Sequence, residues 1–231
     1  MTNSRWEIFW DGLAKRLMFW SPLRSRLLYQ YRYAFTPAQL ARLTALATEA
    51  ARAEGSFCEI GCYRGYTTVF LNRHLDSIAP HKRYWALDTF GGFVPADVAH
   101  ERGARGKDSV DDRRALDKFT INSQRWFDAT MRQNGVTRVT SVAAAVQDHV
   151  FSAEAKFCFV LIDVDLYLPT KAALEKLWPL VTPGGVIVID DCHEHHVYDG
   201  SRQALDEFAR AHAVTFEVVE TKLGVLRKPA S

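Results

Sequence analysis

Short apolar segments alternate with segments of helical periodicity over most of the chain. FCEI (57–60), YWAL (84–87), KFCFVLID (156–163) and VIVID (186–190) are apolar almost throughout, as strands buried on both faces of a sheet are. RVTSV (138–142) predicts a fifth strand, and VTFEVVE with KLGVLRK predicts a C-terminal hairpin of two more. The alternation predicts an α/β fold with a doubly wound, mainly parallel, seven-stranded sheet.

Capping and turn residues mark where several of these elements begin and end. Thr36, Pro37 and Gln39 form a capped helix start, with Thr36 as the cap, Pro37 in the first turn and Gln39 completing a capping box. PGG at 183–185 predicts a turn between a helix over 170–180 and the last apolar strand. The polar, charge-rich stretch at about 96–116 predicts a long loop.

Residues 1–33 form a separate opening segment. Its apolar residues recur at steps of three and four, the period of a helix: Trp6, Phe9, Trp10, Leu13, Leu17 and Trp20. Six basic and two acidic residues give it a net charge of +4. Such a helix packs its apolar stripe on the main domain or on a second copy of the chain, or lies on an anionic membrane surface. We therefore divide the chain into an N-terminal helical extension (1–35) and a main domain (36–231).

Length and composition narrow the class of protein. The 231 residues are 48% hydrophobic and 24% charged, which is typical of a globular domain and excludes wholesale disorder or a fibrous repeat. The net charge of +2 is too balanced for a dedicated nucleic-acid binder. No apolar run approaches the ~18 residues of a spanning helix, and the start does not resemble a secretory signal. The four scattered cysteines favour reduced core thiols, so we expect a soluble, cytoplasmic protein.

The turn after the first strand predicts a nucleotide-like ligand. EIGCYRG (59–65) contains Gly61 and Gly65, which let the backbone bend and approach a ligand closely. Tyr63 stands where a dinucleotide-binding G-x-G-x-x-G turn has its second glycine. Asp88 ends the next strand, where a carboxylate accepts hydrogen bonds from ribose hydroxyls. Together these residues favour a nucleoside without a pyrophosphate, such as S-adenosylmethionine.

Four carboxylates follow the next two apolar strands. Asp163 and Asp165 lie in IDVDLY, and Asp190 and Asp191 lie in VIDDC. Neighbouring parallel strands bring these acids to one edge of the sheet, where so much negative charge is costly unless a cation offsets it. Hard oxygen ligands suit magnesium, manganese or calcium.

A second metal candidate follows directly. CHEHH at 192–196 could form a softer zinc site, although its spacing is more compressed than in usual zinc motifs. We prefer to interpret it as a loop over the substrate, with His193 as an alternative general base.

Taken together, FCEIGCYRGYTTVF, ALDTFGGF, LIDVDLYLPTKAALEKLWPLVTPGGVIVIDDC and GSRQALDEF resemble the macrocin-type O-methyltransferases. These are metal-dependent class I S-adenosylmethionine enzymes that methylate sugar hydroxyls on bacterial natural products. The resemblance runs from about 55 to 210, and its specific part is D-x-D-L-Y followed by P-G-G-x-x-x-x-D-D. Val164 and Gly91 depart from the family pattern, which commonly has glycine and a bulkier residue there.

The resemblance implies a role for several residues. Asp163, Asp190 and Asp191 would hold Mg²⁺ or another divalent cation, and Asp165 would be the general base. The cofactor S-adenosyl-L-methionine would be bound by Glu59, Gly61, Tyr63, Gly65, Thr67, Asp88, Thr89 and Asp163. The acceptor would be a small molecule or glycoside. The sequence leaves open whether the protein forms a homo-oligomer.

Elementary chemistry gives the metal a purpose. A sugar hydroxyl is a poor nucleophile, and coordination to a divalent cation lowers its pKa. Asp165 would then take the proton while the methyl group is transferred in line.

Three alternative functions remain open. A phenolic, catechol-like O-methyltransferase would need an apolar slot, and the polar 96–116 stretch favours the sugar. A nicotinamide-dependent sugar oxidoreductase would share Asp88, but Tyr63 and the four acids argue against it. Residues 1–33 could instead serve membrane-surface binding, or could act with the 96–116 stretch as a lid over the acceptor.

Overall fold

The computed structural model describes residues 4–22, 24–28, 30–107, 119–193 and 199–230. It divides the chain into two compact units, one ending at Ala34 and the other beginning at Phe35. The first unit contains α1 (Arg5–Trp20) and α2 (Arg24–Leu27), and the second contains all the described strands. No helix in the described ranges combines the length and apolarity needed to cross a membrane.

The second unit is built on the predicted seven-stranded sheet, in the order β3-β2-β1-β4-β5-β7-β6. The strands are β1 (Ser56–Ile60), β2 (Tyr84–Asp88), β3 (Val139–Ala143), β4 (Phe157–Ile162), β5 (Val181–Ile189), β6 (Phe216–Val219) and β7 (Leu223–Arg227). The first five pair in parallel, whereas β7 pairs antiparallel with both β5 and β6. The expected doubly wound, mainly parallel sheet with a C-terminal hairpin is confirmed.

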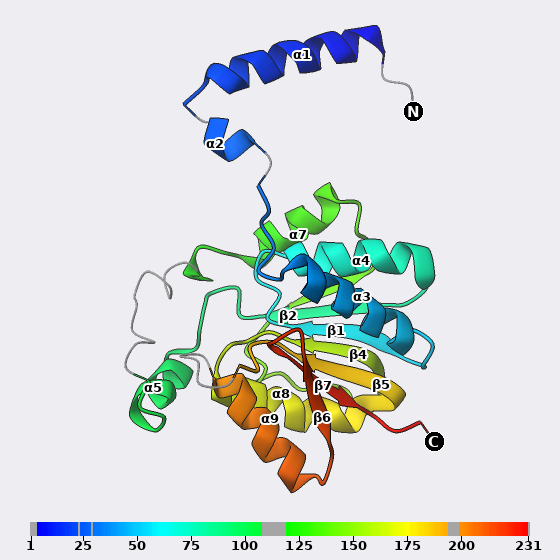
Figure 1. Cartoon of the computed structure of the whole chain (residues 1–231), viewed down its shortest axis with the longest axis vertical. Coiled ribbons are helices and arrows are strands. Elements are labelled where there is room, and N and C mark those ends of the chain that lie inside the picture. The colour runs from blue at the N-terminus through cyan, green and yellow to red at the C-terminus, as the bar shows by residue number, and fades with distance from the viewer. Residues whose placement is uncertain (1–3, 23, 29, 108–118, 194–198, 231) are drawn as a thin grey trace. The chain divides into compact units, whose positions relative to one another are not determined.

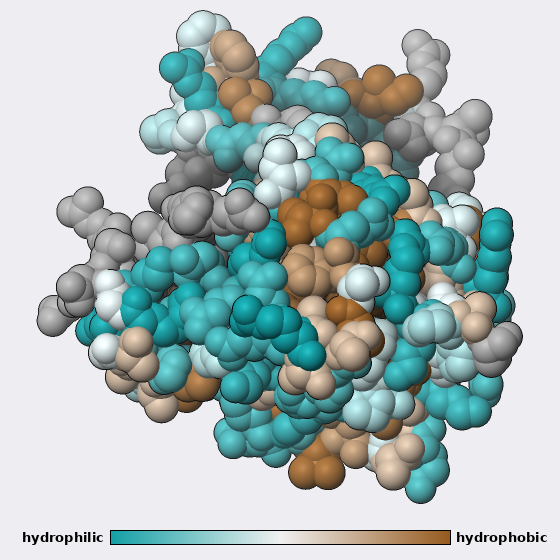
Figure 2. Space-filling view, turned by 60° about the horizontal axis from the view of Figure 1, so that its bottom comes forward, coloured by the Kyte–Doolittle hydropathy of each residue, from teal (hydrophilic) through white to brown (hydrophobic). Residues whose placement is uncertain are grey.

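Helices cover both faces of the sheet (Figure 1). On one face lie α3 (Pro37–Ala50), α4 (Tyr66–Ile78) and α7 (Gln124–Gln133), and on the other lie α8 (Tyr167–Leu177) and α9 (Gly200–Ala211). Every residue of the central strand β4 is buried, which explains why its sequence is apolar at each position rather than at alternate ones. The face of the molecule in Figure 2 is mostly hydrophilic, with small hydrophobic patches between the polar residues.

The first helix of this unit, α3, begins at the capping residues that the sequence predicted. The Thr36 side chain accepts a hydrogen bond from the backbone of Gln39, and the Gln39 side chain accepts one from the backbone of Thr36. This capping box satisfies two N–H groups that have no partner within the helix. The apolar side chains of Leu40, Leu43 and Leu46 on this helix are buried, as their spacing predicted.

Two sequence predictions about connections are wrong. PGG at 183–185 lies within β5, where the pairing with β4 shifts register, so it forms an irregularity inside a strand rather than a turn before it. Within the stretch expected to be a loop, Pro95–Gly103 is helix α5. Pro95 suits its first turn, and Val98 and Glu101 are buried, so tertiary contacts stabilise a helix with little apolar character. Residues 108–118, including Asp111 and Asp112, lie outside the described residues.

The helix expected to start at residue 170 begins three residues earlier, at Tyr167, and continues as a 3-10 turn at Trp178–Leu180. Pro169 lies in its first turn, where a missing backbone N–H removes no helical bond. All four cysteines, Cys58, Cys62, Cys158 and Cys192, are free thiols and buried, which confirms the prediction of reduced core residues.

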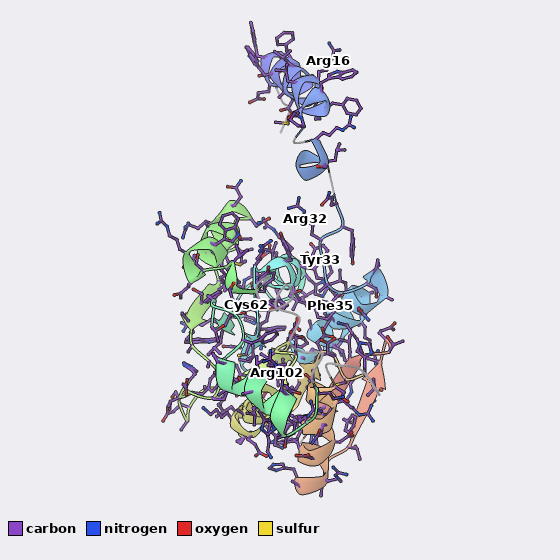
Figure 3. The ribbon with its side chains drawn as sticks, turned by 90° about the vertical axis from the view of Figure 1, so that its left-hand side faces the viewer. Arg16, Arg32, Tyr33, Phe35, Cys62 and Arg102 are labelled. Atoms are coloured by element: carbon purple, nitrogen blue, oxygen red, sulfur yellow. The ribbon has the colours of Figure 1, made fainter. Side chains whose placement is uncertain are left out.

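The N-terminal unit is helical where its apolar periodicity predicted. Helix α1 begins with a capping box between Ser4 and Glu7. Figure 3 labels Arg16 on this helix, and Arg32 and Tyr33 on the segment that follows α2. The large apolar side chains of the predicted stripe, including Trp6 and Trp20, are exposed. That the extension and the main domain have separate roles stays a prediction.

Candidate functional site

The turn after β1 is shaped by two glycines with left-handed backbones. Gly61 has φ +86°, and a Cβ there would lie 1.8 Å from the backbone oxygen of Asp163. Gly65 has φ +82° and stands at the N-terminus of α4, where a Cβ would approach Met131 to 2.5 Å. Only glycine fits either position. The reason at Gly61 is close packing against the end of β4, and at Gly65 it is close packing against α7.

Asp88 closes this turn from the neighbouring strand. One carboxylate oxygen accepts a hydrogen bond from the backbone N–H of Tyr63 at 2.7 Å, and the other accepts one from Phe90 at 2.6 Å. Burial raises the pKa of Asp88, although these hydrogen bonds act in the opposite direction. The carboxylate is therefore fixed in orientation at the carboxyl end of β2, with further lone pairs on both oxygens. The labelled Cys62 in Figure 3 marks the adjacent end of β1.

Glu59 lies beneath the turn rather than on its surface. Its side chain is buried, and one oxygen accepts hydrogen bonds from the hydroxyls of Thr68 at 2.6 Å and Tyr84 at 2.8 Å. Burial raises the pKa of Glu59 to about 7, with the two hydrogen bonds opposing the shift and Asp88 adding to it. Glu59 thus joins β1 to α4 and β2, and its predicted contact with the cofactor stays a prediction.

The two predicted threonines lie in different local settings. Thr67 is half-buried in the first turn of α4. Thr89 follows Asp88, and its hydroxyl donates to the backbone oxygen of Gly92 at 2.6 Å. That bond forms a tight turn at the end of β2, so Thr89 shapes the chain beside Asp88.

The structure brings the four predicted acids to one edge of the sheet. The backbone N–H of Asp163 donates to Ile60, and that of Asp190 donates to Ile162, both at 2.8 Å. These bonds continue the ladders β1–β4 and β4–β5 past the strand ends. Asp165 and Asp191 then turn through left-handed backbones, with φ of 61° and 56°.

The four carboxyl groups interact strongly with one another. Burial, followed by repulsion from Asp190, Asp165 and Asp191, raises the pKa of Asp163 well above its usual range. Burial and the neighbouring Asp191, to which it is hydrogen-bonded, do the same to the pKa of Asp165. The pKa of Asp190 rises to about 6 for the same two reasons. This edge therefore carries negative charge whose repulsion is only partly relieved.

Lys222, which the sequence analysis did not identify, supplies a positive charge in this cluster. Its ammonium lies 2.6 Å from Asp190 Oδ2 and 3.2 Å from Asp191 Oδ1. Burial opposes its charge, but attraction to Asp190 and Asp191 outweighs burial and raises the pKa of Lys222. The residue comes from the turn between β6 and β7, 31 residues after Asp191. No motif marks it, because its position depends on how the hairpin pairs with β5.

The described residues contain no group of three or more His, Cys, Asp or Glu side chains arranged as ligands of one metal ion. The magnesium site of Asp163, Asp190 and Asp191 therefore stays a prediction. Of the alternative zinc motif, Cys192 is buried, and residues 194–196 lie outside the described residues. The Nε2 atom of His193 lies 3.8 Å from Asp191 Oδ1, so the predicted alternative base does lie beside the acidic cluster.

A pocket with charged and amide residues in its walls extends from His193 along α9. It has a volume of about 340 Å³ and is lined by Arg105, His193, Asp199, Arg202, Gln203, Asp206 and Arg210. Arg105 is held by buried Glu101 and by Asp199, at 2.6 Å from the latter. Charged and amide side chains of this kind can form hydrogen bonds with hydroxyl groups.

Comparison with known proteins identifies the family. Residues 35–224 match the family described as Macrocin-O-methyltransferase (TylF). The chain is 24% identical over 173 residues to 8-demethyl-8-(2,3-dimethoxy-alpha-L-rhamnosyl)-tetracenomycin-C 4'-O-methyltransferase from Streptomyces olivaceus. That alignment covers 72% of this chain and 62% of the relative, so the chain spans less than two thirds of the relative's length.

Solved structures share the fold. The O-methyltransferase NovP has a TM-score of 0.69 at 20% identity, covering 82% of this chain and 79% of NovP. The calicheamicin methyltransferase CalS11 has a TM-score of 0.65 at 20% identity, covering 98% of this chain and 94% of CalS11. At this identity the likeness establishes the class I methyltransferase architecture.

Proposed function

The chain belongs to the macrocin O-methyltransferase (TylF) family, and from this we propose that it transfers a methyl group from S-adenosylmethionine to a hydroxyl of a sugar on a natural product or glycan. The observation that carries the proposal is the meeting of two features at one sheet edge. These are the Gly61 turn with Asp88 fixed behind it, and the carboxylates of Asp163 and Asp190 on the next two strands. Ligands of doubly wound sheets bind at such carboxyl ends.

The cofactor part of the proposal rests on Asp88 and the turn. Asp88 is aligned by two backbone N–H groups, so its remaining lone pairs can accept hydrogen bonds from two ribose hydroxyls. The Tyr63 side chain stands where a dinucleotide-binding turn needs glycine, which favours a nucleoside without a pyrophosphate. Glu59, Gly61, Gly65, Thr67, Thr89 and Asp163 form or support the same turn in this proposal.

The acidic cluster fits a divalent cation in its chemistry. All its donors are carboxylate oxygens, which are hard ligands, and Asp190 Oδ1 is buried with no hydrogen-bond partner among the described residues. Asp163, Asp190 and Asp191 would hold the ion. When bound, a divalent cation such as Mg²⁺ lowers the pKa of a hydroxyl that it coordinates.

The remaining steps depend on the chain's own residues. Asp165 takes the proton of the acceptor hydroxyl, because it lies two residues after Asp163, and placement beside the acceptor matters more for a general base than its pKa. The acceptor oxygen forms a bond to the methyl carbon as the bond from that carbon to the sulfonium sulfur breaks. The charged and amide groups in the pocket beside His193 can form hydrogen bonds with the hydroxyl groups of a sugar acceptor.

The acceptor class also agrees with the names of related proteins. The Streptomyces relative is described as acting at a 4' position of a rhamnosyl-bearing compound, and CalS11 is described as a TDP-rhamnose 3'-O-methyltransferase. We extend to this chain only the class, a sugar hydroxyl.

Calorimetry with S-adenosylmethionine and its demethylated product tests the cofactor assignment. The wild type should bind both, and Asp88→Ala should bind them much more weakly. Glu54→Gln is the control, because exposed Glu54 lies before the start of β1, at the opposite end of the strand. Binding of NAD with none of the sulfonium compound would contradict methyl transfer and support an oxidoreductase.

The role of residues 1–33 stays a prediction, namely that they act with the 96–116 stretch as a lid over the acceptor. Deletion of residues 1–20 should then raise the KM for the acceptor more than the KM for the cofactor. If both constants are unchanged, sedimentation with anionic vesicles and measurement of the oligomeric state will distinguish membrane contact from contact with a second copy.

A further inference from the structure

Lys222 occupies the position in the acidic cluster that a cation would need. Its ammonium lies within 3.2 Å of a carboxylate oxygen of both Asp190 and Asp191. These are two of the three residues assigned to the metal in the proposed function. The Lys222 side chain is only 12% exposed, so water does little to screen the contact.

The surrounding structure anchors the backbone of Lys222 and places an aromatic ring beside its ammonium. The backbone oxygen of Lys222 accepts a hydrogen bond from the N–H of Cys192 at 2.7 Å, directly after the paired acids. The ammonium also lies 4.9 Å from the ring centre of buried Phe35, a distance at which an aromatic face attracts a cation. The backbone of the hairpin turn is thus tied to the end of β5, while the four-carbon side chain retains several rotatable bonds.

An ammonium and a divalent cation cannot share these oxygens without a cost. They carry like charges, and both would lie within about 4 Å of each other if they contacted the same carboxylates. Even at the dielectric constant of bulk water, that repulsion corresponds to more than about tenfold in affinity. A bound metal ion therefore requires Lys222 to leave, or binds weakly beside it.

We propose that Lys222 is a built-in competitor for the divalent-cation site: its ammonium offsets part of the negative charge of Asp190 and Asp191 in the metal-free protein, and a metal ion binds by displacing it. The inference rests on the proposed metal site. It assigns a new role to the β6–β7 turn, which sets how tightly the protein holds its metal. Lys222 thus stabilises the acidic cluster when no metal is bound, and it thereby lowers the affinity of the site for a metal ion.

Titration of Mn²⁺ into the full-length, metal-free protein tests this proposal by calorimetry. Lys222→Met keeps an unbranched side chain against Phe35 and removes the charge. It should bind Mn²⁺ at least about tenfold more tightly than the wild type. Lys228→Met is the matched control, because Lys228 also lies over an aromatic ring, that of Trp178 at 4.3 Å. It should bind Mn²⁺ within about twofold of the wild type.

A thermal measurement provides a second readout. Without metal, Lys222→Met should melt at a lower temperature than the wild type, because the carboxylates lose their counter-charge. Saturating Mn²⁺ should raise the melting temperature of this variant more than that of the wild type. Lys222→Arg retains the charge, so it should bind Mn²⁺ no more tightly than the wild type. This variant keeps the proposal testable if the methionine variant does not fold.

The outcomes separate the two proposals. Mn²⁺ binding that is lost in Asp190→Asn but is equal, or weaker, in Lys222→Met would leave the metal site standing and overturn the competition. Tight binding by Lys222→Arg would overturn it as well. Absence of Mn²⁺ binding in both the wild type and Lys222→Met would overturn the metal site itself, and the competition with it.

Discussion

Replacement of Glu59 by glutamine should make the protein more stable at neutral pH. The Glu59 side chain is only 1% exposed, and its carboxylate accepts hydrogen bonds from the hydroxyls of Thr68 and Tyr84. Both bonds end on the same oxygen, so the single carbonyl oxygen of glutamine can accept both. Glutamine has nearly the same shape and removes the charge, which is the part that burial disfavours.

The magnitude follows from the pKa. Burial raises the pKa of Glu59 from 4.5 to about 7. The folded protein is therefore about 3 kcal/mol more stable when Glu59 is protonated than when it is ionised. Below pH ~4.5 the carboxyl is protonated in the folded and the unfolded protein, and this stability is fully present. As the pH rises towards 7, the unfolded chain loses the proton first, and the free energy of unfolding of the wild type falls. Above pH ~7 the loss is complete.

Denaturant unfolding of the wild type and Glu59→Gln between pH 4 and pH 8.5 measures this effect. The free energy of unfolding of the variant, minus that of the wild type, should increase by about 3 kcal/mol between pH ~4.5 and ~7 and then level off. The difference between the two proteins removes the titration of the acidic cluster, which they share. Glu54→Gln is the control, because this exposed carboxylate pairs with Lys156 at the surface, and it should stay within about 0.5 kcal/mol throughout. A difference that does not change with pH would refute the reasoning.

Other residues give independent predictions. Gly61→Ala should lower the free energy of unfolding by more than about 3 kcal/mol, whereas Gly103→Ala, where a Cβ meets nothing within 4 Å, should change it by less than about 1 kcal/mol. Asp165→Asn should reduce the turnover number by about 10²–10⁴-fold and His193→Ala by less, and the opposite order with cofactor binding intact would make His193 the base. Glu101→Gln should lower the free energy of unfolding by about 2 kcal/mol in denaturant unfolding, because buried Glu101 accepts hydrogen bonds from Arg105 and, at 2.6 Å, from the backbone N–H of Tyr167. A loss as small as that of a surface ion pair would contradict this.

The sequence predicted those parts of the fold that depend on local patterns. Apolar segments located the parallel strands, and the Thr36 capping box located the start of α3. PGG at 183–185 was misinterpreted because an irregular strand and a turn use the same residues. Helix α5 was missed because its stability comes from contacts of Val98 and Glu101, and not from a periodic apolar stripe.

The sequence also predicted the positions of those site residues that follow from the pairing of parallel strands. Asp88 ends β2, and Asp163 and Asp190 directly follow β4 and β5. These strands neighbour β1 or one another, so parallel pairing alone brings the three acids to one edge. The position of Lys222 depends instead on the insertion of β7 between β5 and β6. The sequence predicted the hairpin of β6 and β7, but it does not indicate that β7 pairs antiparallel with β5.

The position of β7 in the sheet also bears on how the protein is made. Synthesis delivers β5 and its paired acids well before the hairpin, yet β7 lies next to β5 and brings Lys222 with it. Until residues 216–227 have left the ribosome, β5 has an unpaired edge, which is a hazard for aggregation, and the carboxylates have no ammonium beside them. Folding of this sheet is therefore completed after translation of its last strand, and a nascent chain arrested before the hairpin should be a substrate for chaperones.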